Sequence, residues 1–243
     1  DFFVNEHVLI PRQDTETLVE LVLEEQQGKQ QEEQQEKQQV QQPEEQQEKQ
    51  QEQQPEEQQK KQRGQQSEEQ PGKPRKLLDL CTGSGCSAIS LAVKGGFESV
   101  TATDLSEEAL KVARSNGEKL LDQPVNFIKS DMFSALDPEK QYDVIVSNPP
   151  YIPSQVIEGL EPEVKDHEPR MALDGEPDGL KFYRILAEEG KKYLKNGGSI
   201  YMEIGWDQAK DVTEIFEAMG FSGLRTVRDM AGNDRVVCAR KEK

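Results

Sequence analysis

The tetrapeptide Asn148-Pro149-Pro150-Tyr151 is the part of the sequence whose residue types point most directly to chemistry. The two prolines restrict the backbone and remove two N–H donors, so the carbonyls of the segment have a rigid presentation. The side-chain oxygen of Asn148 and the carbonyl of Pro149 can then accept both N–H groups of a planar amino or amide group. The ring of Tyr151 can lie against the plane of that group. A turn without a ligand is the alternative interpretation.

A glycine-rich turn lies earlier in the chain, with the sequence Asp79-Leu80-Cys81-Thr82-Gly83-Ser84-Gly85. It lies between an expected strand at 77–80 and an expected helix at 84–94. Gly83 and Gly85 let the backbone turn sharply and let a ligand approach the main chain. Such turns bind NAD, FAD and S-adenosylmethionine alike, and a purely structural turn is also compatible with the pattern.

Acidic residues end the next two expected strands. Asp104 lies 19 residues beyond Gly85, where a carboxylate can accept hydrogen bonds from both hydroxyl groups of a ribose. Asp131 and Met132 follow the third strand and would lie beside an adenine ring, the first as a polar contact and the second as a soft packing surface. Together with the glycine-rich turn, these positions predict a cofactor that contains a nucleoside.

The elements that must position these residues alternate along the chain. Strands are expected at 77–80, 99–104, 125–130, 142–147, 198–204, 221–229 and 233–240, and helices at 15–25, 84–94, after Ser106, up to Lys195 and at 206–219, with a loop-rich stretch at 148–177. This alternation predicts an α/β fold, a doubly wound, mostly parallel seven-stranded sheet with helices on both faces. The last two strands have no helix between them, so we expect an antiparallel C-terminal hairpin at the sheet edge. The tetrapeptide and the glycine-rich turn then face one crevice, because ligands bind at the carboxyl ends of such strands.

Residues 26–70 differ in composition from the rest of the chain, with 22 Gln and 11 Glu and a 12-residue repeat that starts at residue 31. The repeat units have no apolar face, so they cannot stack as a solenoid. We expect a disordered surface insert, since loop-closure entropy grows only slowly with length; an interaction tract is the alternative. The globular domain is then residues 1–25 together with 71–243.

Charge and composition exclude several classes of protein. The net charge is −17, of which the insert contributes −5, and an acidic domain is a poor partner for nucleic acid, so no direct nucleic-acid binding is expected. The sequence has no apolar stretch near the ~20 residues of a membrane span and no secretory signal. Three cysteines without a CxxC pair favour a reducing, cytoplasmic location. His7 and His167 are too isolated for a metal site, and no metal is expected.

The sequence resembles the catalytic domain of the HemK/PrmC family. The similar blocks are FVNEHVLIPRQDTETLVE (3–20), LLDLCTGSGCSAISLA (77–92), SNPPYI (147–152), EPRMALDGEPDGLKFYRIL (168–186) and RDMAGNDRVV (228–237). Members of this family methylate the glutamine of the Gly-Gly-Gln motif in class I peptide chain release factors. The resemblance implies the class I S-adenosylmethionine-dependent methyltransferase fold, S-adenosyl-L-methionine as cofactor, a release factor as protein partner, and methyl transfer to the glutamine N5 atom.

The resemblance also assigns roles to residues. It implies cofactor contacts for Asp79, Cys81, Thr82, Gly83, Ser84, Gly85, Asp104, Asp131, Met132 and Asn148, substrate contacts for Arg12, Asn148, Pro149, Pro150 and Tyr151, and catalytic roles for Asn148, Pro149 and Tyr151. Arg12 is placed over the cofactor pocket, although helix capping by Asp14 or Thr15 explains its segment equally well. Cys81 stands where many members have glycine, and Met132 where some have an aromatic residue. The chain starts eleven residues before Arg12, so the family's N-terminal helical domain is expected to be absent.

Three other functions remain open from the sequence. A glutamine methyltransferase for a ribosomal protein shares the Asn-Pro-Pro-Tyr motif and a similar glycine-rich turn, but the PRQDTE and RDMAGNDR blocks favour the release-factor branch. An adenine-N6 nucleic-acid methyltransferase fits the tetrapeptide and conflicts with the acidic charge. A non-catalytic binding protein, with the Gln-rich tract as its interaction element, is the third alternative. The sequence contains no evident general base.

Overall fold

The computed structural model describes residues 1–28 and 75–242. The chain divides into two units, one formed by residues 1–23 and 75–243 and the other by residues 24–74. Of the second unit only residues 24–28 are described, and they are helical. The repeat that starts at residue 31 lies outside the described residues, so its expected disorder and the domain boundaries at 25 and 71 stay predictions.

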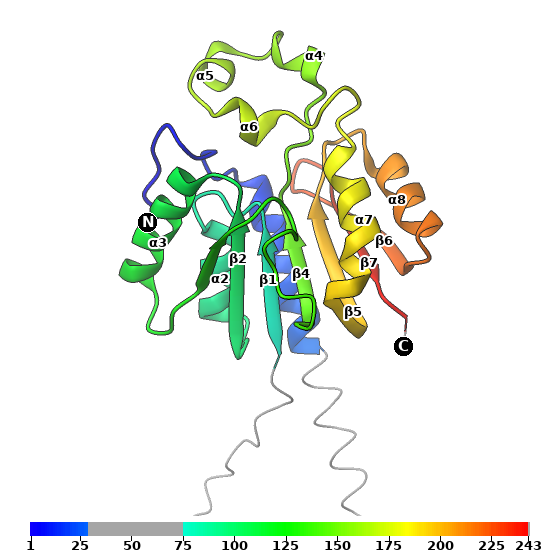
Figure 1. Ribbon diagram of the computed structural model, residues 1–243. Helices are drawn as coiled ribbons and strands as arrows, with labels where there is room; N and C mark the ends of the chain where they lie inside the picture. Colours follow the sequence, from blue (N-terminus) through cyan, green and yellow to red (C-terminus); the bar gives the residue numbers. More distant parts are fainter. Residues whose placement is uncertain (29–74, 243) are drawn as a thin grey trace, which may run out of the picture. The chain divides into compact units, whose positions relative to one another are not determined.

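A seven-stranded sheet forms the centre of the larger unit (Figure 1). The strands are β1 (Lys76–Leu80), β2 (Ser99–Asp104), β3 (Asn126–Lys129), β4 (Tyr142–Ser147), β5 (Leu194–Glu203), β6 (Ser222–Arg228) and β7 (Asp234–Arg240). Their order is β3-β2-β1-β4-β5-β7-β6, with the first five parallel and β7 antiparallel to both β5 and β6. The predicted mostly parallel, doubly wound sheet with a closing antiparallel hairpin is therefore confirmed. Within this hairpin, β7 lies between β5 and β6, so β6 forms the edge of the sheet.

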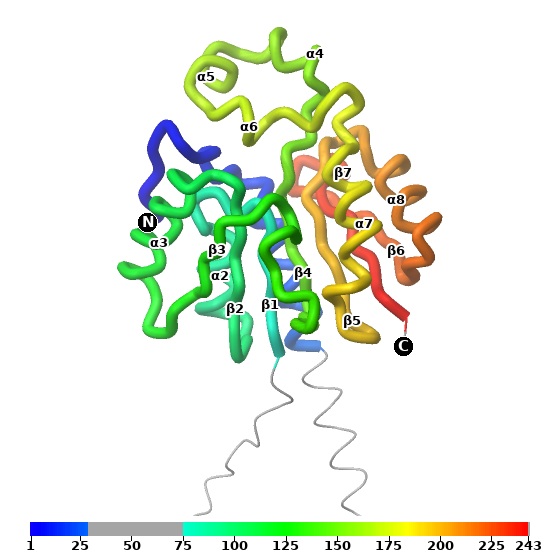
Figure 2. The backbone as a smooth tube through the Cα atoms, in the orientation of Figure 1, coloured from blue at the N-terminus to red at the C-terminus, as the bar shows by residue number. Residues whose placement is uncertain are grey.

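Two apolar layers cover the two faces of this sheet. One layer contains Leu18 and Val22 of the helix that begins at residue 14, together with residues of α2 (Cys86–Lys94). The other is formed by α7 (Lys181–Tyr193) and α8 (Ala209–Ala218). The backbone trace in Figure 2 shows α7 and α8 together at the β5 side of the sheet. Alternate residues of each strand enter alternate layers, as the two-residue repeat of a strand requires.

The strand β4 illustrates this alternation. Val144 and Val146 pack in the layer of Leu18 and α2, whereas Ile145 packs in the layer of α7 and α8. Each of these three side chains is at most 1% exposed. Asn148 continues the spacing of Val144 and Val146 one step beyond the strand, which places it on the side of the sheet where the first helix lies.

The helices agree with the expected ranges, with shifts at their ends. The α3 helix (Glu107–Leu120) begins as predicted, because the Oγ of Ser106 accepts a hydrogen bond from the Ala109 N–H. The α2 helix begins at Cys86, two residues later than expected, since Gly85 adopts a left-handed conformation as its N-cap. The α7 helix ends at Tyr193, because Leu194 already begins β5.

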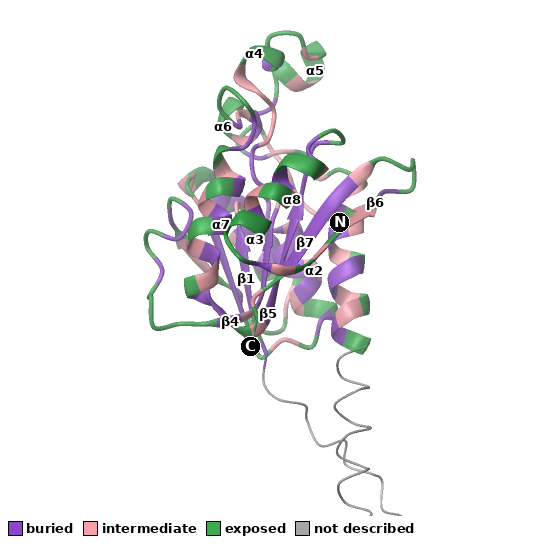
Figure 3. Ribbon diagram, turned by 90° about the vertical axis from the view of Figure 1, so that its right-hand side faces the viewer, coloured by how far each residue is buried: buried purple, intermediate pink, exposed green. Residues whose placement is uncertain are grey.

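The stretch expected to be loop-rich, 148–177, contains three helices of four residues each. They are α4 (Ser154–Ile157), α5 (Pro162–Lys165) and α6 (Arg170–Leu173). The stretch projects beyond the carboxyl ends of the parallel strands and is largely exposed, whereas the central strands β1, β4 and β5 are mostly buried (Figure 3). Across the parts of the chain that the structure describes, helices with the length and apolar character needed to cross a membrane are absent.

Candidate active site

A cleft opens at the carboxyl ends of the parallel strands, with a volume of about 1000 Å³ when its open mouth is included. A space of this size can hold a nucleoside-containing ligand. Ten of the residues singled out in the sequence line it: Asp79, Cys81, Thr82, Gly83, Ser84, Asp104, Asp131, Met132, Asn148 and Pro150. They come from the ends of four neighbouring strands, so the fold brings together positions spread over 70 residues of sequence.

The two glycines of the turn have different surroundings. Both have positive φ, +56° at Gly83 and +82° at Gly85. A Cβ atom at Gly83 would meet no atom within 4 Å, whereas a Cβ at Gly85 would lie 3.1 Å from side-chain atoms of both Ala113 and Ile89. Gly83 therefore leaves open space in the cleft. Gly85 does not line the cleft, and it allows α2 and α3 to pack closely.

Asp104 is held by the turn that it faces. Its Oδ2 accepts a hydrogen bond from the Gly83 N–H, and its Oδ1 accepts one from the Ser106 N–H, both at 2.9 Å. Burial raises the pKa of Asp104, while these backbone hydrogen bonds lower it. The carboxylate is thus oriented before any ligand binds, and each oxygen retains a lone pair that a hydroxyl group can use.

Asp79 is a second buried acid in the cleft. Thr82 donates a hydrogen bond from its Oγ1 to Asp79 Oδ2 at 2.6 Å. Burial raises the pKa of Asp79 to about 7, with a smaller contribution from the nearby charge of Asp104, while the Thr82 hydrogen bond lowers it. A cationic ligand group beside Asp79 would favour its ionised form.

Cys81 and Met132 both have left-handed backbone conformations, with φ of +61° and +48°. Their sulfur atoms are 3.7 Å apart. The positive φ gives a physical reason why glycine suits the position of Cys81. Burial and the charges of Asp104 and Asp79 raise the pKa of the Cys81 thiol, so this residue is a packing group and not a nucleophile.

Asn148 lies directly after β4, and its Nδ2 donates a hydrogen bond to Thr15 Oγ1 at 3.3 Å. Thr15 belongs to the first turn of the helix that begins at residue 14, and it also lines the cleft. This contact joins the PRQDTE segment to the Asn-Pro-Pro-Tyr segment. Pro150 lines the cleft beside Asn148, whereas Pro149 is buried and does not line it.

Tyr151 is held by its backbone and by its hydroxyl group. Its carbonyl accepts a hydrogen bond from Gln208 Nε2 at 2.9 Å, and its hydroxyl lies 3.5 Å from Glu203 Oε1. Gly175 packs against the same backbone, where a Cβ would come within 2.8 Å of Tyr151 Cα. The Tyr151 ring packs partly against the core and does not line the cleft.

Arg12 forms an ion pair with the buried carboxylate of Glu168. Its neighbour Pro11 lines the cleft, while Arg12 itself does not. Arg170 forms exposed ion pairs with Glu158 and Asp174.

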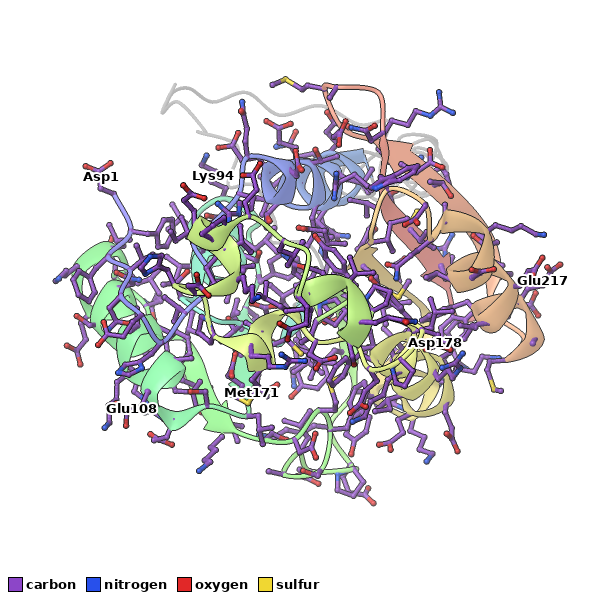
Figure 4. All side chains as sticks on the ribbon, turned by 90° about the horizontal axis from the view of Figure 1, so that it is seen from above. Asp1, Lys94, Glu108, Met171, Asp178 and Glu217 are labelled. Atoms are coloured by element: carbon purple, nitrogen blue, oxygen red, sulfur yellow. The ribbon has the colours of Figure 1, made fainter. Side chains whose placement is uncertain are left out.

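Sequence reasoning missed several residues of the cleft. Thr103 lines it, and its Oγ1 is buried without a hydrogen-bond partner among the described residues. Met171 and Phe182 line it from α6 and α7. Seen from above, Met171 lies over the body of the domain, whereas Glu108 and Glu217 lie at opposite sides (Figure 4). Thr103 could have been found from its place next to Asp104 at the end of a buried strand; Met171 has no comparable signal. Within residues 1–28 and 75–242, groups of three or more metal-ligating side chains are absent.

Comparisons with known proteins agree with this geometry. A family model described as the methyltransferase small domain matches residues 66–159. A release factor glutamine methyltransferase of Fusobacterium nucleatum is 45% identical over 167 residues, which are 68% of this chain and 47% of that protein. One of Clostridium acetobutylicum is 35% identical over 241 residues, 98% of this chain and 70% of that protein.

A solved structure of a methyltransferase from Pyrococcus furiosus has a TM-score of 0.52 and 24% identity, and the match covers 70% of this chain and 76% of that one. This likeness concerns the fold alone. The chain spans about half the length of the curated relatives that it matches, from 47% to 60% for three of them.

Proposed function

Because the chain belongs to the family of release factor glutamine methyltransferases, we propose that it methylates a glutamine side chain in a protein. The methyl donor is S-adenosyl-L-methionine, and the acceptor is the N5 atom of the glutamine in the Gly-Gly-Gln motif of class I peptide chain release factors. The observation that carries this proposal is the position of Asn148. It lines the same cleft as the glycine-rich turn, Asp104 and Met132, so an amide-binding group and a nucleoside-binding surface meet in one space.

The cleft fits this cofactor in its polar groups. Asp104 can accept hydrogen bonds from the ribose hydroxyls, and Gly83 leaves room for the ligand beside the main chain. The unpartnered Oγ1 of Thr103 is a buried polar atom that a polar ligand would satisfy. Asp131 and Met132 provide a polar edge and an apolar surface for the adenine ring. Asp79 is the acid for a cationic part of the cofactor.

S-adenosyl-L-methionine supplies an electrophilic methyl group attached to a sulfonium. The nitrogen of a glutamine amide is a poor nucleophile, because its lone pair is delocalised into the carbonyl group. Asn148, which lines the cleft, accepts an N–H group of this amide, which orients the nitrogen and stabilises positive charge as it develops there. The product proton leaves to water. The Tyr151 hydroxyl is not a base for it, because burial and the charge of Glu203 raise the pKa of this hydroxyl and keep it protonated.

The other residues named from the sequence do not line the cleft, and they hold the segments that do. Gly85 allows α2 to pack closely against α3. Arg12 holds Glu168 by an ion pair, and the next residue, Pro169, lines the cleft. Pro149 and Tyr151 do not line the cleft, and they shape the backbone that follows Asn148. Residues of α6 line the cleft, and the stretch from α4 to α6 lies beyond the carboxyl ends of the parallel strands, where a protein substrate would enter (Figure 1).

A methyl-transfer assay tests the proposal. The purified chain is incubated with S-adenosyl-L-methionine and an intact class I release factor, and the release factor is then analysed by peptide mass spectrometry. One added methyl group on the Gly-Gly-Gln glutamine is expected, with none on a control release factor in which this glutamine is alanine. Methyl transfer to a ribosomal protein or to adenine in nucleic acid, with none to the release factor, would contradict the proposal.

A further inference from the structure

Glu203 is a buried acid that the proposed chemistry does not yet use. It is the last residue of β5 and is 1% exposed. In the parallel pairing of β4 and β5, Ser147 lies opposite Met202, so Asn148 and Glu203 occupy the next position of the two strands. Side chains at matching positions of neighbouring strands point to the same face. Both residues therefore lie on the side of the sheet that the first helix covers.

Thr15 of that helix joins the two side chains. Its Oγ1 donates a hydrogen bond to Glu203 Oε2 at 2.7 Å and accepts one from Asn148 Nδ2 at 3.3 Å. Thr15 is 6% exposed, so the chain of hydrogen bonds is shielded from water. The other oxygen of the carboxylate, Oε1, lies 3.5 Å from the hydroxyl of Tyr151. One carboxylate thus contacts both polar side chains of the Asn-Pro-Pro-Tyr segment, one of them through Thr15.

The chemistry of these groups gives the chain a direction. An ionised carboxylate only accepts hydrogen bonds, so the single hydroxyl hydrogen of Thr15 is directed to Glu203. Thr15 then presents a lone pair to Asn148, which fixes the NH2 end of the Asn148 amide on that side. The Oδ1 end is left to accept an N–H group in the cleft. An uncharged group in place of the carboxylate would permit the reverse direction.

The charges around Glu203 come from three other elements. Arg235 of β7 lies 3.1 Å from Asp14 Oδ2 and 3.2 Å from Asp229 Oδ2, and it donates a hydrogen bond to the carbonyl of Ile204, next to Glu203. Burial raises the pKa of Glu203 and the charge of Asp14 adds to this, while the Thr15 hydrogen bond, the charge of Arg235 and the Asn148 side chain lower it. The Arg235 cation is therefore the counter-charge that offsets the burial of this acid, which gives a role to the RDMAGNDR block.

We propose that Glu203 is a positioning residue, which acts through the Thr15 hydroxyl to keep the Asn148 side-chain oxygen directed at the substrate amide. This inference rests on the proposed function, because it concerns how the same site accepts an N–H group. Glu203 itself does not touch the substrate. Its contribution is a fixed orientation of the acceptor, and a misdirected acceptor lowers the rate of the chemical step by about 10- to 100-fold.

The Thr15 position offers a matched test. Thr15→Val keeps the side-chain shape and removes the hydroxyl, whereas Thr15→Ser keeps the hydroxyl. Thr17→Val is the control in the same helix, since two residues correspond to a rotation of about 200° and turn the side chain away from Asn148. The measured quantities are kcat and KM for S-adenosyl-L-methionine with an intact release factor, together with the melting temperature of each variant.

Thr15→Val is expected to lower kcat by about 10- to 100-fold and to leave the KM for the cofactor near its original value. Thr15→Ser and Thr17→Val should keep kcat. Glu203→Gln should lower kcat as Thr15→Val does, and its kcat should depend less on acidic pH than that of the original protein, because the carboxylate that takes up a proton is no longer present. The double variant of Thr15→Val and Glu203→Gln should be no slower than the worse single variant, because both act through one hydrogen-bond chain.

Two results would overturn this inference alone. The first is a Thr15→Val protein with unchanged kcat, in a preparation whose original protein methylates the glutamine. The second is a Thr15→Ser protein impaired as much as Thr15→Val, with a melting temperature that falls in parallel. An original protein that transfers no methyl group to the glutamine would instead overturn the proposed function, and this inference with it.

Discussion

The guanidinium of Arg12 and the carboxylate of Glu168 form an ion pair across 156 residues of chain. The Glu168 side chain is 2% exposed and that of Arg12 is 44% exposed. The second carboxylate oxygen, Oε2, is buried without a partner among the described residues. Pro11 and Pro169 are the chain neighbours of the pair, and both line the cleft. The pair therefore joins two walls of the candidate active site.

Arg12→Met leaves the buried Glu168 carboxylate without its cation. Burial already raises the pKa of Glu168 and Arg12 lowers it, so the substitution raises this pKa further. The free energy of unfolding should fall by about 1–2 kcal/mol at pH 8. The loss should be smaller at pH 5 than at pH 8, because the raised pKa of Glu168 favours proton uptake in the variant as the pH falls. Urea denaturation at both pH values measures this. The control is Arg170→Met, whose pair with Glu158 is more than half exposed on both sides, so its effect on stability should be much smaller. Equal losses for the two variants would contradict the assignment.

Asn148→Ala removes the side-chain acceptor that the proposed mechanism requires. The expected loss in kcat is about 100- to 1000-fold, comparable to the loss of one group that stabilises transition-state charge. The affinity for the cofactor should change little, because Asp104 and the glycine-rich turn remain. Single-turnover kinetics and equilibrium titration with S-adenosyl-L-methionine separate the two quantities. Unchanged turnover would remove Asn148 from the catalytic role.

Gly83→Ala and Gly85→Ala form a matched pair, since both residues have positive φ and they differ in surroundings. Gly85→Ala should lower the free energy of unfolding by about 2–4 kcal/mol, because backbone strain and crowding against Ala113 add. Gly83→Ala should lower the free energy of unfolding by about 1–2 kcal/mol, because it has the backbone strain without the crowding. Its new methyl group faces the cleft. It should therefore weaken cofactor binding more than Gly85→Ala does. Calorimetric titration and thermal unfolding check both; a reversed order would refute the distinction.

Asp79 makes stability depend on pH. Its pKa is about 7 in the folded protein and near 3.8 in an unfolded chain, so the folded state binds more protons between these values. The contribution of Asp79 to stability is fully present below about pH 4 and is lost as the pH rises toward 7. Asp79→Asn removes this loss. Between pH 4.5 and 7.5, the unfolding free energy of the variant relative to that of the original protein should rise by on the order of 2 kcal/mol. If the difference in unfolding free energy between the two proteins, measured with urea, does not change with pH, the pKa of Asp79 is not raised in the folded protein.

Thr103→Val tests the unpartnered hydroxyl in the cleft wall. The substitution replaces a buried polar atom by a methyl group of similar size, so the protein without ligand should gain about 1 kcal/mol in stability. If the hydroxyl binds the cofactor, the affinity of the variant for S-adenosyl-L-methionine should fall about 5- to 10-fold. Thermal unfolding with and without the cofactor measures both. A variant with unchanged stability and affinity would show that Thr103 Oγ1 has another partner.

Local patterns in the sequence were sufficient for most of the fold. Two-residue alternation and buried apolar runs predicted the strands, and Ser106 with its acidic first turn predicted the start of α3. The start of α2 at Cys86 was missed by two residues, because a glycine in the left-handed conformation is not visible in the hydrophobic pattern. The short helices α4 to α6 were missed, since four residues are too few to show helical spacing.

The sequence by itself determined which chemical groups this protein offers: the glycine-rich turn, Asp104, Met132 and Asn148, at strand ends that a parallel sheet must place along one edge. Only the tertiary structure decided how they are supported. It separated Gly83 in the cleft from Gly85 between two helices, and it directed Tyr151 toward Glu203. It also brought Thr15 between Asn148 and Glu203. Contacts between residues more than 100 positions apart depend on strand register and on where a helix packs, and neither property is visible in the local pattern that predicts each element.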